Sequence, residues 1–137
     1  MARKVIDYTI ETEGRDKGKV FQITEMSAAQ AERWALRAFQ AMAKGGVDVP
    51  DLIGAGMAEF AIAGIRGLSY ASYHEVEPLL AEMMACVRIK PDANNPSVVR
   101  DLIETDIEEL KTRLDLRAEW LNLHTGFLQA GDPSTSA

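Results

Sequence analysis

Alternating apolar and polar residues near the N-terminus predict a β-hairpin. Ile6, Tyr8 and Ile10 alternate with polar residues, which is the period of a half-buried strand. The charged segment 11–18 follows, and its two glycines suit a turn before a second β-rich run over 20–24. Because a two-stranded hairpin is marginal in water by itself, we expect it to pack on helices or to pair with another chain.

A helical period begins directly after the hairpin. Ser27 and Gln30 have the spacing of a capping box, in which two polar side chains satisfy backbone N–H groups at a helix start. The next apolar residues recur on one helix face, and they are Ala31, Trp34, Ala35, Ala38, Phe39 and Met42. Gly45 and Gly46 provide a stop, since glycine readily adopts the left-handed conformation after a helix. The pattern predicts an amphipathic helix between these signals.

Two further segments have weaker helical signals. Residues 51–66 are rich in Ala and Gly and apolar almost all round, which is typical of a buried helix. Each interior glycine costs up to about 1 kcal/mol relative to alanine, so tertiary packing must hold this segment. Further along we expect a turn over 70–77, a short helix beginning near Pro78 and an extended run over 86–90. A loop rich in Pro and Asn follows.

The longest predicted helix runs over 106–128, with Thr105 and Glu108 as its capping box. It has two apolar stripes about 140° apart on a helical wheel. The first stripe consists of Ile107, Leu110, Leu114, Ala118, Leu121 and Leu128. The second stripe consists of Leu116, Trp120, Leu123 and Phe127, and it begins only halfway along the helix. The second half of the helix therefore needs apolar contacts on two sides, from this chain or from another.

Taken together, these elements predict an α+β fold that is mostly α-helical. An N-terminal β-hairpin is followed by about four helices, and the last one is long. We expect a single domain over 1–130, made of the hairpin at 1–26 and a helical body at 27–130. The end of the chain at 131–137 has the Gly, Pro and Ser content of a disordered tail.

Composition narrows the class of protein. The 137 residues suffice for one domain, and 15 Lys and Arg against 21 Asp and Glu give a net charge of −6. An acidic chain is a poor nucleic-acid binder, because such proteins need a basic footprint. One cysteine excludes a disulfide framework and a multi-cysteine zinc site. No apolar leader or bilayer-length apolar run is visible, so we expect a cytoplasmic protein without a membrane partner.

Few side chains offer catalytic chemistry. His74 lies near Glu75 and Glu77, but a metal site needs several ligands in a defined geometry. His124, on the long predicted helix, is more typical of a helix surface or interface than of a catalytic base. Cys86 follows two methionines and an alanine, which favours a buried apolar residue over a nucleophile. We therefore predict a protein that is not an enzyme and that binds no cofactor or metal.

The second stripe of the long helix is the better candidate for a functional site. Leu116, Trp120, Leu123 and Phe127 form either internal core or a surface for partner binding or self-association. Both interpretations stay open, and the second makes a homo-oligomer possible. The edges of the hairpin weakly favour the same kind of function, since a free strand edge accepts another strand.

Several short segments have a familiar order along nearly the whole chain. They are the charged turn at 14–18, the run Phe21-x-Ile23-Thr24-Glu25-Met26, the segment 31–35, the Gly/Ala-rich middle, the segments 77–82, 86–89, 106–110 and 116–119, and Gly126-Phe127. In the order and residue content of these segments, the chain resembles the tail assembly chaperones of long-tailed bacteriophages of the siphophage type. None of these segments is a catalytic motif.

The resemblance implies a non-enzymatic scaffold in the cytoplasm of a bacterial host. Such a protein binds the tape-measure protein, promotes polymerisation of tail-tube subunits and is absent from the mature virion. The family often also makes a longer product by ribosomal frameshifting near the C-terminus. The alternative is a small helical regulatory protein acting through protein–protein contacts. A helix-turn-helix over 28–65 fits that alternative, but no basic recognition helix follows.

Overall fold

A computed structural model describes residues 3–44 and 72–130, apart from the side chains of Met42 and of residues 126–130. Its four antiparallel strands lie across the sheet in chain order, and they are β1 (Val5–Thr9), β2 (Val20–Thr24), β3 (Val87–Lys90) and β4 (Arg100–Asp101). The described part also contains three α-helices, which are α1 (Ala28–Lys44), α4 (Tyr73–Met84) and α5 (Leu110–Ala130). The predicted α+β class is confirmed.

The predicted hairpin is present as β1 and β2, and it pairs with β3 in the same sheet. Tyr8 lies opposite Phe21, and Phe21 lies opposite Ile89 on its other side. These residues follow the period of two, so one face of the sheet collects the apolar side chains. Because β3 and β4 come from the second part of the chain, the segment expected to be a helical body also contributes half of the strands. Of these, β3 confirms the extended run predicted over 86–90.

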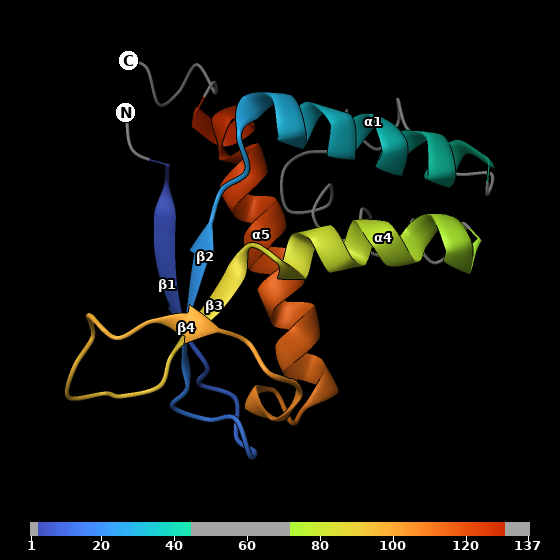
Figure 1. Ribbon diagram of the computed structural model, residues 1–137. Helices are drawn as coiled ribbons and strands as arrows, with labels where there is room; N and C mark the ends of the chain where they lie inside the picture. Colours follow the sequence, from blue (N-terminus) through green and yellow to red (C-terminus); the bar gives the residue numbers. More distant parts are fainter. Residues whose placement is uncertain (1–2, 45–71, 131–137) are drawn as a thin grey trace.

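The helices lie to one side of the sheet (Figure 1). There α1 and α4 run side by side, and α5 passes between the sheet and these two helices. The indole Nε1 of Trp34 on α1 donates a hydrogen bond of 2.9 Å to the carbonyl oxygen of Leu79 on α4. The rings of Trp34 and Trp120 lie 4.6 Å apart between centroids, so three helices meet around one aromatic pair.

Two helix starts differ from the prediction. The expected turn over 70–77 is wrong from residue 73 onward, because α4 begins at Tyr73 after Ser72 and contains Pro78. A proline in the second turn removes one backbone hydrogen bond. Burial of Val76, Leu79 and Met83 on the inner face of α4 offsets this loss.

The last helix also begins later than the prediction. A short 3-10 turn occupies Glu104–Asp106, and α5 begins at Leu110 instead of residue 106. The capping box of Thr105 and Glu108 does not form within the described contacts. A residue from the β1–β2 turn takes its place, as described below.

The helix count differs as well, since about four helices were expected and the described residues contain three. The helix expected over 51–66 and the tail expected over 131–137 lie outside the described residues. The core of the described part joins the inner face of the sheet to α4 and α5. Its most deeply buried apolar residues are Phe21, Ile23, Leu79, Met83, Leu116 and Trp120.

Candidate functional site

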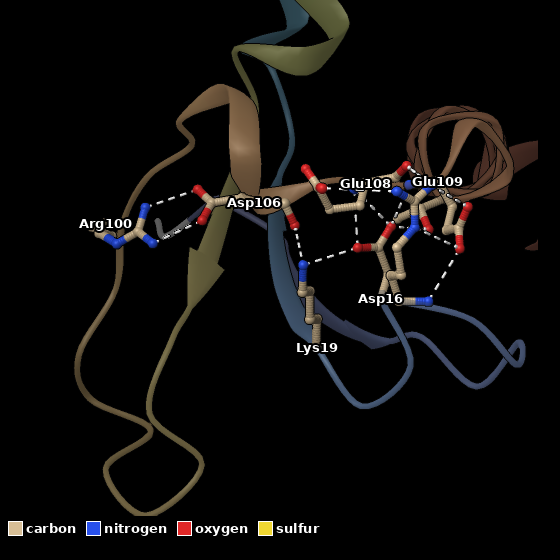
Figure 2. A network of polar contacts seen from close by, with 8 residues as sticks. Asp16, Lys19, Arg100, Asp106, Glu108 and Glu109 are labelled. Atoms are coloured by element: carbon tan, nitrogen blue, oxygen red, sulfur yellow. Dashed lines mark hydrogen bonds and ion pairs between the residues drawn. The ribbon is translucent and has the colours of Figure 1, made fainter.

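A network of charged residues joins the β1–β2 turn to the start of α5 (Figure 2). Its centre is Asp16, which is 1% exposed although it carries a carboxylate. Asp16 accepts hydrogen bonds from the backbone N–H groups of Glu108, at 3.0 and 3.1 Å, and of Glu109, at 2.9 Å. The hydroxyl of Thr112 donates a further bond of 2.7 Å, and the ammonium of Lys19 lies 2.9 Å away. Asp16 thus anchors the entry and the first turn of α5 from 92 to 96 residues away in the sequence.

Hydrogen bonds stabilise the ionised form of the buried Asp16 side chain. Burial by itself raises the pKa of a carboxyl group. The hydrogen bonds from Lys19, Thr112 and the two backbone N–H groups outweigh burial and hold the pKa of Asp16 well below its usual value. The position adds to this effect, because the N-terminal end of a helix favours negative charge. Asp16 is therefore ionised at any physiological pH.

A second set of contacts surrounds the same turn. The guanidinium of Arg15 donates to Glu109 Oε1 at 2.9 Å and to the carbonyl oxygen of Glu108 at 2.8 Å. These hydrogen bonds hold the pKa of Glu109 below its usual value. Gly14 lies against the same carboxylate with a φ of +146°, and a Cβ added there would approach Glu109 Oε2 to 2.8 Å. The positive φ favours glycine here, since a residue with a Cβ would be strained in this conformation.

The network continues to the short 3-10 turn through Asp106. Arg100 binds the Asp106 carboxylate with two nitrogens, each at 2.8 Å, which is the bidentate geometry of a strong ion pair. Asp106 Oδ2 also accepts the N–H of Ile103 at 2.7 Å. These bonds, the one from Arg100 first, lower the pKa of Asp106. Lys19 connects the contacts around Asp16 with those around Asp106, because its ammonium also donates to the carbonyl oxygen of Asp106 at 2.8 Å.

The role of this network is structural. Its two central carboxylates are occupied by hydrogen bonds from the protein itself. Among the described residues, no group of three or more His, Cys, Asp or Glu could hold a metal ion. The network fixes the position and rotation of the first turn of α5, and with it the side chains that this turn presents to solvent. We call these contacts the polar clamp, defined by Arg15, Asp16, Lys19, Arg100, Asp106, Glu109 and Thr112.

The predicted surface stripe lies mostly inside the molecule. Leu116 is 0% and Trp120 is 2% exposed, and Leu123 is half-buried against the same core. The side chain of Phe127 lies outside the described part. Leu116 and Trp120 therefore follow the internal-core alternative and offer no exposed surface, because the sheet and the other two helices cover that side of α5.

The exposed apolar side chains of the described part of α5 are Leu110 and Leu114 of the first stripe, whereas Leu121 of the same stripe is buried. Leu110 is 71% and Leu114 is 41% exposed, and the neighbouring Ile103 is exposed as well. This surface was not predicted, because both stripes are apolar and nothing in their spacing tells which of their residues face the core. The clamp decides between them, and a contact between residues so far apart in the sequence gives no local signal.

The surroundings of His74, Cys86 and His124 do not favour a catalytic role. His74 is exposed. Cys86 is half-buried, and burial raises the pKa of its thiol, which disfavours the reactive thiolate. His124 accepts the N–H of Met26 on Nε2 at 2.9 Å, while Nδ1 lies 2.8 Å from the carbonyl oxygen of Trp120. Both ring nitrogens are thus engaged in a neutral ring with its proton on Nδ1.

Comparisons with protein-family models, with curated proteins and with solved structures find no significant match. Within the described residues, no helix combines the length and the hydropathy required to cross a membrane. The candidate site of this chain is therefore defined by its own geometry. It is the exposed apolar surface formed by Leu110 and Leu114 at the start of α5, where the polar clamp contacts the helix.

Proposed function

We propose that this chain is a non-enzymatic tail assembly chaperone of a long-tailed bacteriophage or prophage. It binds the tape-measure protein in the cytoplasm of the bacterial host, promotes assembly of tail-tube subunits around that protein, and is absent from the mature virion. The resemblance in the order of sequence segments suggests this family.

One structural observation supports the proposal more than any other. Leu110 and Leu114, one helical turn apart, form an exposed apolar surface at the start of the longest described helix. Contiguous exposed apolar side chains are typical of interaction sites. A helix of another protein can dock on such a surface through apolar residues spaced three and four apart. A small contact area would also permit release, which a scaffold absent from the final particle requires.

A pull-down from lysogenic or infected cells tests the proposal. The tagged chain is compared with the double variant Leu110→Ser, Leu114→Ser and with Leu36→Ser, which changes an exposed leucine on α1. We expect the chain and the control to retain a very long, mostly helical protein and a tail-tube subunit, both identified by mass spectrometry. The double variant should lose them.

Two results would contradict the proposal. One is recovery of neither protein by the unaltered chain. The other is salt-dependent binding of DNA, which would favour the regulatory alternative. The genome provides an independent check, since we expect the reading frame to lie between those of a tail-tube protein and a tape-measure protein.

A further inference from the structure

The exposed apolar surface of α5 continues into two arginines. At 100° per residue, Leu110, Arg113, Leu114 and Arg117 lie within an arc of about 100° on the helix. Leu110 and Leu114 are exposed, Arg113 is half-buried, and Arg117 is 9% exposed. One face of the first half of α5 therefore combines apolar side chains with two positive charges.

These arginines differ from Arg15, Arg37 and Arg100, and Arg117 is also buried, unlike the exposed Arg33. Arg15, Arg37 and Arg100 each bind a carboxylate at 2.7 to 2.9 Å. Arg113 and Arg117 take part in no ion pair between described residues. The buried Nε of Arg117 has no hydrogen-bond partner either.

An unpaired buried guanidinium is costly. Its removal from water is not compensated unless an anion or a hydrogen-bond acceptor replaces the lost hydration. Burial lowers the pKa of Arg117, and the positive charge of Arg113 lowers it further. The two charges repel each other, so a carboxylate placed between or beside them would relieve both costs at once.

We propose that the face formed by Leu110, Arg113, Leu114 and Arg117 docks an amphipathic helix that carries carboxylates beside its apolar residues. This inference rests on the proposed function and names the chemistry of the partner. The apolar residues of that helix would contact the two leucines. Its Asp or Glu side chains would bind the guanidinium groups, which match a carboxylate in two-nitrogen geometry.

Charge complementarity favours this occupant. The chain has a net charge of −6, yet this face carries two positive charges that no described carboxylate neutralises. The ion pair of Lys111 with Asp115, at 2.9 Å, lies on a different side of α5, about 100° or more from Leu110. It does not neutralise the arginines.

Three synthetic peptides test the proposal by fluorescence anisotropy with the full chain. Each has about 20 residues, which is long enough to form a helix, with Leu at positions i, i+3, i+4 and i+7. The residues flanking the leucines are Glu in the first peptide, Gln in the second and Lys in the third. We expect the Glu peptide to bind about tenfold more tightly than the Gln peptide and the Lys peptide to bind most weakly.

Variants of the chain distinguish the contribution of the arginines from that of the leucines. Arg113→Gln should weaken binding of the Glu peptide about tenfold and leave the Gln peptide unchanged. Leu114→Ser should weaken both. The matched controls on α1, Arg33→Gln and Leu36→Ser, change an exposed arginine and an exposed leucine and should have no effect. Thermal melts establish that every variant is folded.

Each other outcome has a definite meaning. Equal binding of the Glu and Gln peptides, unaffected by Arg113→Gln, would overturn the acidic partner while leaving the apolar surface and the proposed function intact. A dimer in sedimentation that Leu114→Ser dissociates, with no peptide binding, would identify a second copy as the occupant and overturn the proposal. Absence of binding to any of the three peptides would overturn it too. The pull-down described above would then test the proposed function independently.

Discussion

The two stripes of α5 are alike in composition, but residues near their starts differ in environment, and Leu121 further along the first stripe is buried again. Leu114 is 41% exposed, whereas Leu116, two residues further along the same helix, is 0% exposed. Both belong to apolar stripes that extend over several turns. Helical periodicity thus identifies apolar faces, but it does not tell which part of each face is buried in the folded chain.

Two polar contacts fix the rotation of α5, one near each end of the helix. At the start, Asp16 binds the backbone of Glu108 and Glu109 and the hydroxyl of Thr112. Further along, His124 accepts the N–H of Met26 at the entry to α1. A rotation that exchanged the two stripes would break both contacts. The predictions below therefore test the inner stripe, the two contacts and the outer stripe in turn.

The largest effect is expected at the inner stripe. Trp120→Ala should lower the free energy of unfolding by about 3–5 kcal/mol, because it removes a buried aromatic side chain and leaves a cavity. Leu114→Ala on the outer stripe should change it by about 0.5 kcal/mol or less. Urea unfolding followed by circular dichroism measures both. Similar losses for the two variants would contradict the assignment of the stripes.

Removal of the clamp should have the next largest effect. Asp16→Ala leaves two backbone N–H groups and the Thr112 hydroxyl without their acceptor, so we expect a loss of about 2–3 kcal/mol. Asp16→Asn keeps one acceptor oxygen and should lose less. The exposed Glu13→Ala, in the same turn, is the control and should lose little. Urea midpoints of the three variants provide the test.

The clamp also predicts acid sensitivity. Because the pKa of Asp16 is lower in the folded protein than in the unfolded chain, its contribution is complete above the ordinary value of about 3.9. It is lost as the pH falls below that value, and Asp106 and Glu109 act in the same direction. Unfolding between pH 5 and pH 2 should show a steep loss of stability. That loss should be shallower in Asp16→Asn, and equal slopes would argue against the clamp.

A smaller dependence on pH is expected at the other end of α5. Burial lowers the pKa of His124, with the hydrogen bond to Trp120 and the charge of Glu25 acting in the opposite direction. The stability from the neutral ring is complete above its ordinary pKa of about 6.5 and is lost as the pH falls below it. Protonation of Nε2 also removes the acceptor for Met26. His124→Gln should flatten the stability curve between pH 7 and pH 5, measured by urea unfolding.

The local elements were largely predictable from the sequence. The period of two in β1 and β2, and the Ser27 cap with its hydrogen bond of 3.1 Å to the N–H of Gln30, are local signals that the structure confirms. The start of α4 was not predicted, because Pro78 looked like a first-turn residue and the burial of Leu79 is a tertiary effect. The short strand β4 has two residues and no pattern of its own.

The candidate site was harder to predict. Both stripes of α5 were predicted, but the possible surface was placed at the second stripe with Leu116 and Trp120, where the structure has Leu110 and Leu114. The reason is physical, since the rotation of a helix with two apolar faces depends on distant partners. Asp16 and Thr112 are 96 residues apart, and neither residue by itself indicates the other.

Thiol labelling tests the orientation of α5 most directly. In a Cys86→Ser background, Leu114→Cys and Leu116→Cys place a single thiol at each of the two stripes. The account predicts that the thiol at position 114 reacts with a maleimide nearly as fast as in the unfolded chain. The thiol at position 116 should react at least about 100-fold more slowly, since only opening of the fold exposes it. Equal rates in two variants that both unfold cooperatively would contradict the account.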